Sequence, residues 1–206
     1  INGAFFSAGQ RCTASSRLIV TKDIHDSFVD AMSKRMELLR IGDARNPNTD
    51  IGPVVSEAQL KKNLEYLRIG VDDGAKHLIG GHQVEQTTPG WYLSPALFIN
   101  AKSEMQICRE EIFGPIAAVI SVSDYDEALS VANDSEFGLS AGIVSSDRRI
   151  IDHFIDNIQA GMVQINLPTA GMDFHAPITG RKNSSFGPPE KSSYCREFFT
   201  NTKVVH

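Results

Sequence analysis

The stretch IAAVISVSDYDEALSVANDSEFGLSAGIVSSDRRIIDHFIDNIQAGMVQIN, residues 116–166, decides the fold of this chain. It alternates short apolar runs, which have the length of buried strands, with longer segments in which apolar residues recur at helical spacing. Strands are expected at 116–122, 140–144 and 162–166, and helices at 124–133 and 148–158. Strands and helices that alternate through short connections are typical of an α/β protein with a parallel sheet and right-handed crossovers.

Upstream, the same patterns predict further strands and two helices. A helix is expected from about Ile24 to Leu39, with Asp23 as its cap, and a second begins at the capping box Ser56-x-x-Gln59. Additional strands are expected at 15–20, 77–79 and 92–99, and a loop at 168–189. Residues 197–205 alternate like a strand that has no successor, and such a terminal strand often completes a sheet of another subunit.

Composition restricts the class of protein. The 206 residues are 41% hydrophobic and 22% charged. This length and composition suffice for a hydrophobic core in a single large domain. A net charge of −5 argues against binding of nucleic acid, and no apolar run is long enough to span a membrane. Three widely spaced cysteines and no signal peptide indicate a reducing, cytoplasmic location. Because the chain opens with Ile1, we expect a processed product or an excised fragment.

Cys12 is the first candidate for chemistry, because it follows a Gly-Gln-Arg turn and precedes small residues. Such a turn allows the backbone to approach a ligand closely. A free thiol is only about 3% thiolate at neutral pH, so a nucleophilic cysteine needs help, which Arg11 or a helix N-terminus can supply. The alternative is a buried cysteine that serves as a small apolar residue, the role assigned to Cys108 and Cys195.

Two other candidate positions lie at strand ends. In EEIFGP, residues 110–115, a Gly-Pro turn leads into the next strand and puts Glu111 and Phe113 on one side. A carboxylate there can accept hydrogen bonds from ribose hydroxyls while the ring packs against a flat heterocycle; the alternative is a charged turn with Phe113 in the core. Asn166 follows a parallel strand, where ligand contacts are common, although a turn-forming asparagine is equally compatible with the pattern.

Some kinds of site are excluded. His77 and His82 are separated by two glycines and have no third ligand at suitable spacing, so no metal site is expected. The sequence contains neither GxGxxG nor GxxxxGK[ST], so nucleotide phosphates are not bound by those devices. A cysteine hydrolase would need a histidine beside Cys12, and the nearby His25 falls on the exposed flank of its expected helix.

Taken in order, these motifs resemble the aldehyde dehydrogenase superfamily over essentially all 206 residues. The matching segments are FFSAGQRCTASSRLIV (5–20), IGPVVSEAQ (51–59), EEIFGPIAAVI (110–120), GLSAGIVSSD (138–147), GMVQIN (161–166), APITGRKNSSFG (176–187) and EFFTNTKVV (197–205). The resemblance implies a three-layer, parallel-sheet α/β catalytic domain over 1–190 and a tail with an oligomerisation strand over 191–206. It therefore also implies a homo-oligomer.

The resemblance implies a role for each residue that matches a family motif. Cys12 would add to an aldehyde carbon and form a thiohemiacetal, and its backbone N–H would contribute to the oxyanion hole. Hydride transfer to NAD or NADP would leave a thioester that water hydrolyses to a carboxylic acid. Glu111 would bind the nicotinamide ribose, and Phe113 would contact the same cofactor.

On the substrate side, Asn166 matches an asparagine near the active site, and the loop 167–178, with Phe174 and Ile178, would line the aldehyde tunnel. Ile178 replaces the phenylalanine of the family's common Pro-Phe-Gly-Gly. GQRCTAS and NLPTAGMDFHAP resemble members that oxidise semialdehydes of small dicarboxylates, such as 2-oxoglutarate semialdehyde. Arg11 would then pair with the distal carboxylate of the substrate.

In the family, a dinucleotide-binding domain precedes the catalytic cysteine, and this sequence does not contain it. The general-base glutamate and the oxyanion-hole asparagine would be missing with it, so we expect no NAD(P)-dependent turnover by these 206 residues alone. Two alternatives stay open. One is an unrelated thiol enzyme, an acyltransferase or cysteine hydrolase, in which Cys12 acts with a histidine; the other is a non-catalytic fragment that acts only in assembly.

Overall fold

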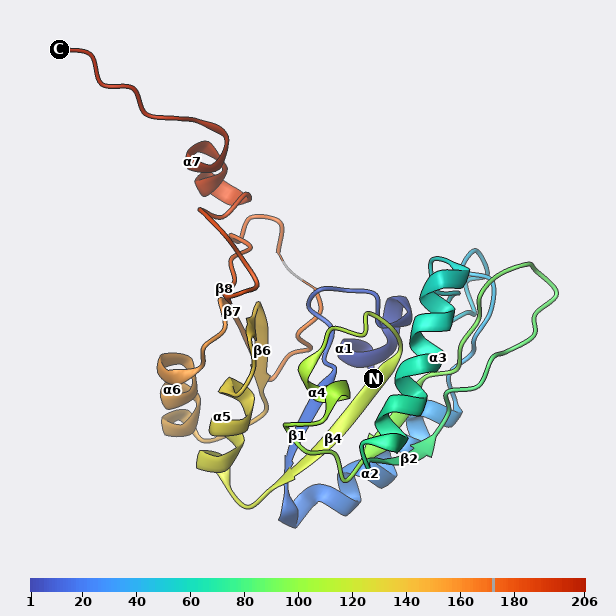
Figure 1. Cartoon of the computed structure of the whole chain (residues 1–206). Helices are drawn as coiled ribbons and strands as arrows, with labels where there is room; N and C mark the ends of the chain where they lie inside the picture. Colours follow the sequence, from blue (N-terminus) through green and yellow to red (C-terminus); the bar gives the residue numbers. More distant parts are fainter. Residues whose placement is uncertain (172) are drawn as a thin grey trace. The chain divides into compact units, whose positions relative to one another are not determined.

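Strand β4, Ile116–Val122, lies in the interior of a four-stranded sheet in the computed structural model, which describes residues 1–171 and 173–206 (Figure 1). On either side it pairs in parallel with β1 (Arg17–Thr21) and β3 (Ala96–Ile99). Strand β2 (Lys76–Ile79) adds to the other edge of β3 in the antiparallel direction. The sheet is therefore mixed and mostly parallel, whereas the sequence predicted parallel pairing.

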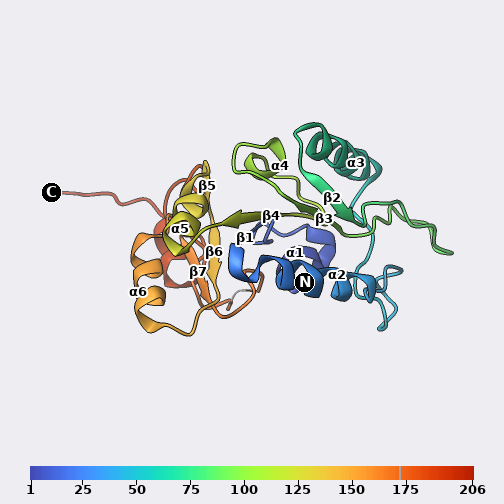
Figure 2. The ribbon, with the colours of Figure 1, turned by 90° about the horizontal axis from the view of Figure 1, so that it is seen from below.

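Helices cover both faces of this sheet, so the expected layering holds for the compact unit Ile1–Asp134 (Figure 2). Helices α1 and α2 pack on one face, and α3 and α4 pack on the other. The helices of this unit are α1 (Asn2–Phe5), the 3-10 turn η1 (Phe6–Gly9), α2 (Lys22–Glu37), α3 (Glu57–Asp72), α4 (Gln106–Arg109) and α5 (Tyr125–Asn133).

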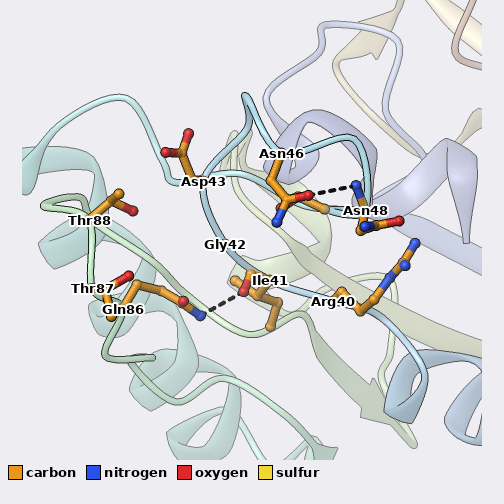
Figure 3. A pocket seen from close by; sticks show the side chains of 10 residues that line it. Arg40, Ile41, Gly42, Asp43, Asn46, Asn48, Gln86, Thr87 and Thr88 are labelled. Carbon is orange, nitrogen blue, oxygen red and sulfur yellow. Dashed lines mark hydrogen bonds between the residues drawn. The ribbon is translucent and has the colours of Figure 1, made fainter.

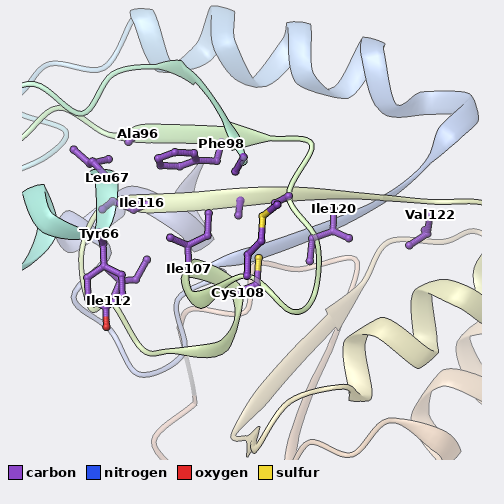
Figure 4. Close-up of a cluster of buried hydrophobic side chains, with 14 residues drawn as sticks. Tyr66, Leu67, Ala96, Phe98, Ile107, Cys108, Ile112, Ile116, Ile120 and Val122 are labelled. Carbon is purple, nitrogen blue, oxygen red and sulfur yellow. The ribbon is translucent and has the colours of Figure 1, made fainter. Parts of the chain in front are cut away.

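The side chains of β4 alternate between the two faces, which explains why IAAVISV is apolar at nearly every position. Its even-numbered residues belong to one buried cluster, with Ile107 and Cys108 of α4 (Figure 4). Ala117 and Val119 belong to a second cluster, which contains Phe5 of α1. A strand buried on both faces is a rigid support for the loops at its ends.

The two long helices test the predicted caps. Helix α2 begins after Thr21 rather than at Asp23, which lies in its first turn; a hydrogen bond from the Thr21 side chain lowers the pKa of Asp23. The Asp23 cap was therefore wrong, because an acidic residue is also favourable inside the first turn. In α3 the N-cap is Ser56, whose side chain accepts a hydrogen bond from the Gln59 N–H, as predicted.

The second compact unit, Ser135–His206, contains a short parallel pair of strands. Strands β6 and β7 are joined by α6, in agreement with the predicted strand-helix-strand unit. They form a separate two-stranded sheet. The elements of this unit are β5 (Phe137–Gly138), β6 (Ser140–Ile143), α6 (Arg148–Asn157), β7 (Met162–Ile165), β8 (Arg181–Lys182), η2 (Ser192–Tyr194) and α7 (Cys195–Phe199).

Two expected strands differ in the structure. The strand expected at 92–99 is β3 alone, which begins after Pro95, a residue without the N–H that a ladder requires. In the strand expected at 197–205, Glu197–Phe199 lie in α7, and residues 200–206 have no strand conformation in the single chain. Alternation alone does not form a strand without an edge to pair with.

None of the described helices is both long and apolar enough to cross a membrane.

Candidate active site around Cys12

Cys12 lies at the surface, in a tight turn closed by a hydrogen bond from the Ala14 N–H to the Arg11 carbonyl oxygen at 2.9 Å. The next residue, Thr13, is buried, so the turn is anchored directly beside the thiol. The Cys12 N–H has no acceptor among residues 1–171 and 173–206. Since Cys12 is an exposed residue, the alternative of a buried apolar cysteine is wrong for it.

The backbone just before this turn is unusual. Ser7, Ala8 and Gly9 have φ values of 57°, 54° and 65°, a run of three left-handed residues. This conformation costs about 1 kcal/mol or more for each non-glycine residue and is therefore held by its surroundings. Ala8 and Gly9 are buried, and the Ser7 carbonyl accepts a hydrogen bond from the Gln10 N–H.

Gly9 brings the Cys12 turn against the turn that carries Glu111 and Phe113. A Cβ atom on Gly9 would lie 2.1 Å from the carbonyl oxygen of Gly114, so only glycine permits this approach. The two turns are 105 residues apart in the sequence and touch through their backbones. The structure therefore brings together the segments that carry four of the predicted site residues, Arg11, Cys12, Glu111 and Phe113.

The 111–115 turn presents Phe113 and Glu111 to solvent. Phe113 has φ 57° and is 37% exposed, so its ring is not in the core. The Lys62 side chain donates a hydrogen bond to the Glu111 carbonyl oxygen at 3.0 Å. In the part of the chain that the structure describes, the Glu111 carboxylate has no hydrogen-bond partner, which leaves it available to a ligand.

Its neighbour Glu110 is different. The Tyr66 hydroxyl and the Gln106 side chain both donate to the Glu110 carboxylate. These hydrogen bonds lower the pKa of Glu110, whereas burial and the same carboxylate raise the pKa of Tyr66 to about 12. Of the two adjacent glutamates, Glu110 serves the structure and Glu111 stays free, a distinction that the sequence alone does not contain.

The start of α3 holds both turns. The Val55 N–H, just before the N-cap, donates to the Gln10 side-chain oxygen at 2.8 Å. The Gln59 side chain donates to the carbonyl oxygens of Ile112 and Phe113, both at 3.0 Å. Gln10 and Gln59 were not among the predicted site residues. The capping box identified Gln59 only as part of a helix start.

Arg11 folds back over the left-handed run. Its Nε donates to Ser7 Oγ at 2.9 Å and its Nη1 to Asn2 Oδ1 at 3.3 Å. Both acceptors are neutral, and no ion pair to Arg11 is present within residues 1–171 and 173–206. The positive charge beside Cys12 is therefore not neutralised within the described chain.

The remaining predicted residues belong to the second unit. Asn166 has φ 56°, and its side chain both accepts a hydrogen bond from the Ser145 N–H and donates one to the Ser145 carbonyl oxygen. It therefore holds the β6–α6 loop, as a turn-forming asparagine would. Phe174 is 75% exposed, with its ring centroid 3.8 Å from that of His175, and Ile178 is half-buried.

Cys108 is buried, as predicted, and this burial raises the pKa of its thiol to about 11. Cys195 is partly exposed, so the expected role of a buried apolar residue was wrong for it. The side chain of His25 is only 15% exposed, so its expected place on an exposed helix flank was also wrong. Cys12 forms no hydrogen bond to a histidine in the described part of the chain, so no observation there favours a Cys–His thiol enzyme. Nor do the described residues contain a cluster of potential metal ligands.

A polar hollow of about 390 Å³ lies elsewhere in the first unit, between the 40–49 and 86–88 loops (Figure 3). Gln86 closes one side by donating a hydrogen bond to the Ile41 carbonyl oxygen at 2.6 Å. None of the predicted site residues lines it, and most of its lining side chains are polar, with Arg40 and Asp43 charged. The geometry around Cys12 is thus independent of this hollow.

The aldehyde dehydrogenase family model matches residues 1–205. The chain belongs to the aldehyde dehydrogenase family. It is 43% identical over 207 residues to the alpha-ketoglutaric semialdehyde dehydrogenase of Bacillus subtilis (strain 168), covering 100% of this chain and 42% of that protein. It is 41% identical over 210 residues to the alpha-ketoglutarate semialdehyde dehydrogenase of Haloferax volcanii, covering 100% of this chain and 43% of the relative.

The fold agrees with the family. The crystal structure of an NAD-dependent aldehyde dehydrogenase from Sinorhizobium meliloti superposes with a TM-score of 0.93 at 34% identity, covering 100% of this chain and 40% of that one. This aldehyde dehydrogenase chain therefore spans about two fifths of the length of the relatives it matches.

Proposed function

We propose that this chain is the catalytic-domain part of an NAD(P)-dependent aldehyde dehydrogenase that oxidises an aldehyde to a carboxylic acid. The observation that carries the proposal is the contact between the Cys12 turn and the Glu111–Phe113 turn through Gly9 and Gly114. It brings the turn that carries the exposed Cys12 into backbone contact with the turn that carries the exposed Glu111 and Phe113.

In this proposal, the thiolate of Cys12 attacks the aldehyde carbon and forms the carbon–sulfur bond of a thiohemiacetal. The Cys12 N–H, which has no acceptor in the described chain, is free to donate to the oxyanion that develops on the aldehyde oxygen. After the carbon loses hydride, the resulting thioester is attacked by water. The acid is released, and the thiol of Cys12 is regenerated.

The nicotinamide cofactor, when bound, supplies the acceptor of that hydride. The chain's own residues fit this group, since the carboxylate of Glu111 has no competing partner in the described chain and can accept hydrogen bonds from ribose hydroxyls. The exposed ring of Phe113 can pack against a flat heterocycle. Nothing in these residues distinguishes NAD from NADP.

We assign residues 1–190 to the catalytic domain and 191–206 to a tail used in assembly. Since the matched relatives are more than twice as long, we propose that the dinucleotide-binding domain, the general base and the second oxyanion donor lie in sequence outside this chain. The 206 residues alone should then show no aldehyde-dependent formation of NAD(P)H. Turnover by the purified chain would refute this assignment.

For the substrate, we propose a semialdehyde that carries a distal carboxylate. The names of the relatives from Bacillus subtilis and Haloferax volcanii support this class. Within the chain, the support is Arg11, whose charge is not neutralised by an ion pair in the described residues and which lies next to the nucleophile. Asn166, Phe174 and Ile178 are proposed as residues on the substrate side.

We further propose a cytoplasmic homo-oligomer. The three cysteines are free, as in a reducing compartment. The C-terminal tail exposes Phe199 and Val205, at 72% and 82%, which supports burial of this segment against another subunit. Removal of residues 200–206 should lower the mass measured by light scattering, and an unchanged mass would contradict this role.

The test of the proposed activity uses the full-length protein that contains this chain. Cys12→Ala should reduce aldehyde-dependent NAD(P)H formation by about a thousandfold or more, because the nucleophile is lost. Cys108→Ala, the matched control, should change it by less than about threefold. A Cys12→Ala enzyme with normal activity would refute the proposal, and turnover of acyl substrates without nicotinamide would support the thiol-enzyme alternative.

A further inference from the structure

We propose that Asn63 is a positioning residue for the Glu111–Phe113 turn and that it acts through Gln59. The inference rests on the proposed function, because it assigns to Asn63 the orientation of the proposed cofactor-binding residues. Asn63 itself is completely buried and cannot touch a ligand.

The first observation is the one-sided hydrogen bonding of Asn63. Its Oδ1 accepts a hydrogen bond from Gln59 Nε2 at 2.8 Å, but its Nδ2 has no acceptor among the described residues. A buried amide with an unpaired donor is unfavourable compared with an apolar side chain of the same size. An apolar residue such as leucine would avoid the unpaired donor but would also lack the Oδ1 acceptor. The role of Asn63 at this position therefore lies in its acceptor.

The second observation is the arrangement around Gln59. Its Nε2 has two hydrogens and three acceptors: Asn63 Oδ1 and the carbonyl oxygens of Ile112 and Phe113, at 2.8, 3.0 and 3.0 Å. If the carboxamide rotated by half a turn, its oxygen would face three other oxygens. Asn63 thus adds one acceptor on a different element from the turn, which keeps the Gln59 NH₂ group, and not its oxygen, directed at the two carbonyls.

The third observation links this pair to the conformation of Phe113. The two carbonyls held by Gln59 flank the left-handed Phe113, whose φ of 57° needs support from its surroundings. Asn63 also packs on Gly114, because a Cβ atom on Gly114 would lie 2.4 Å from Asn63 Oδ1. Asn63 therefore restrains the turn directly at Gly114 and indirectly through Gln59.

The consequence is that the buried Asn63 orients the exposed ring of Phe113 and the carboxylate of Glu111. It does so without contacting the cofactor or the thiol of Cys12. Its loss should affect the cofactor side of the site and leave the Cys12 side unchanged. A residue needed only for folding would lower stability and would change all kinetic constants together.

The experiment compares Asn63→Leu and Asn63→Asp in the full-length enzyme. Leucine keeps the branched shape of the side chain and removes the acceptor, so we expect the KM for NAD(P) to rise about fivefold, the factor for one lost hydrogen bond. The aldehyde KM, kcat and the alkylation rate of Cys12 without cofactor should stay within about twofold, and Tm should stay the same or rise. Aspartate keeps an acceptor toward Gln59 and should restore a cofactor KM near that of the wild type.

A double-mutant cycle tests the path through Gln59. In a Gln59→Leu background, Asn63→Leu should have little further effect on the cofactor KM, because the partner it orients is gone. The inference is overturned if Asn63→Leu leaves the cofactor KM unchanged, if its full effect persists without Gln59, or if a lower Tm accompanies equal changes in all constants. A wild-type enzyme that oxidises no aldehyde with NAD(P) would instead refute the proposed function.

Discussion

Cys12 and Cys108 have the same side chain in opposite surroundings. Cys108 lies in α4 among apolar residues of the main core, and burial raises the pKa of its thiol to about 11. Cys12 lies at the surface in a turn, next to a run of left-handed residues. Core packing therefore keeps one thiol protonated and inaccessible, while a constrained backbone presents the other.

The two cysteines are held in place by different kinds of contact. Around Cys108 the constraint is ordinary side-chain packing, which tolerates small changes at modest cost. Around Cys12 it is backbone contact, with Gly9 against Gly114 and Gln10 bound to Val55. The first kind of constraint supports the sheet, and the second holds the backbone that leads into the Cys12 turn.

The largest expected effect comes from Gly9→Ala. The new methyl group would lie 2.1 Å from the Gly114 carbonyl oxygen, and alanine would also have to adopt a φ of 65°. We expect a loss of about 3 kcal/mol or more in the free energy of unfolding, measured by urea denaturation of the chain.

Gly74→Ala is the matched control. Gly74 also has positive φ, 95°, but no atom lies within 4 Å of its added Cβ. Only the backbone strain remains, about 1 kcal/mol. Equal losses for the two variants would show that the contact between the two turns does not constrain the Cys12 turn.

The next largest effect is a pH dependence of the free energy of unfolding, which arises from the thiol of Cys108. Its pKa is 9.0 when unperturbed and about 11 in the folded chain, so the folded state holds the proton more tightly. The resulting stability is fully present below about pH 9 and is lost as the pH rises toward 11, by roughly 2–3 kcal/mol. Unfolding by urea at a series of pH values measures this loss.

Cys108→Ala should flatten the curve between pH 9 and 11. The comparison is needed because Tyr66, with its pKa raised to about 12, gives a loss of the same sign that begins above pH 10. Identical pH curves for the wild type and Cys108→Ala would show that the thiol of Cys108 is not held protonated by the core.

The smallest effect concerns Arg11, next to the exposed thiol. If its charge pairs with a substrate carboxylate, Arg11→Ala in the full-length enzyme should raise the KM for acidic aldehydes about tenfold. The KM for neutral aldehydes should change much less. Equal increases for both classes would instead assign Arg11 to the support of Ser7 and Asn2, its partners in the structure.

The sequence predicted the elements of the fold well where a periodic pattern was long. The run at 116–122 and the β6–α6–β7 unit follow from apolar spacing, and the structure contains both. The pattern did not predict the partners of the strands, because pairing of β4 with β1 and β3 depends on residues far apart in the chain. The terminal strand was predicted wrongly for Glu197–Phe199, since alternation over a few residues is compatible with a helix.

For the site, the sequence predicted Cys12 and the Glu111–Phe113 pair as chemistry-bearing residues. It did not predict Gln59 or Asn63, whose roles depend on carbonyl groups about 50 residues away. A polar residue at a buried helical position is the signal that could have indicated Asn63. Backbone acceptors leave no pattern in a sequence, so only coordinates reveal them.

The most direct test of the central claim compares the three cysteines of the full-length enzyme in one alkylation experiment. A slow alkylating agent is added with and without NAD(P), and labelled peptides are quantified by mass spectrometry. Cys12 should be labelled well before the partly exposed Cys195, with Cys108 unlabelled, and the rate at Cys12 alone should change when cofactor is present. Labelling of Cys12 no faster than Cys195, with no response to NAD(P), would contradict the account.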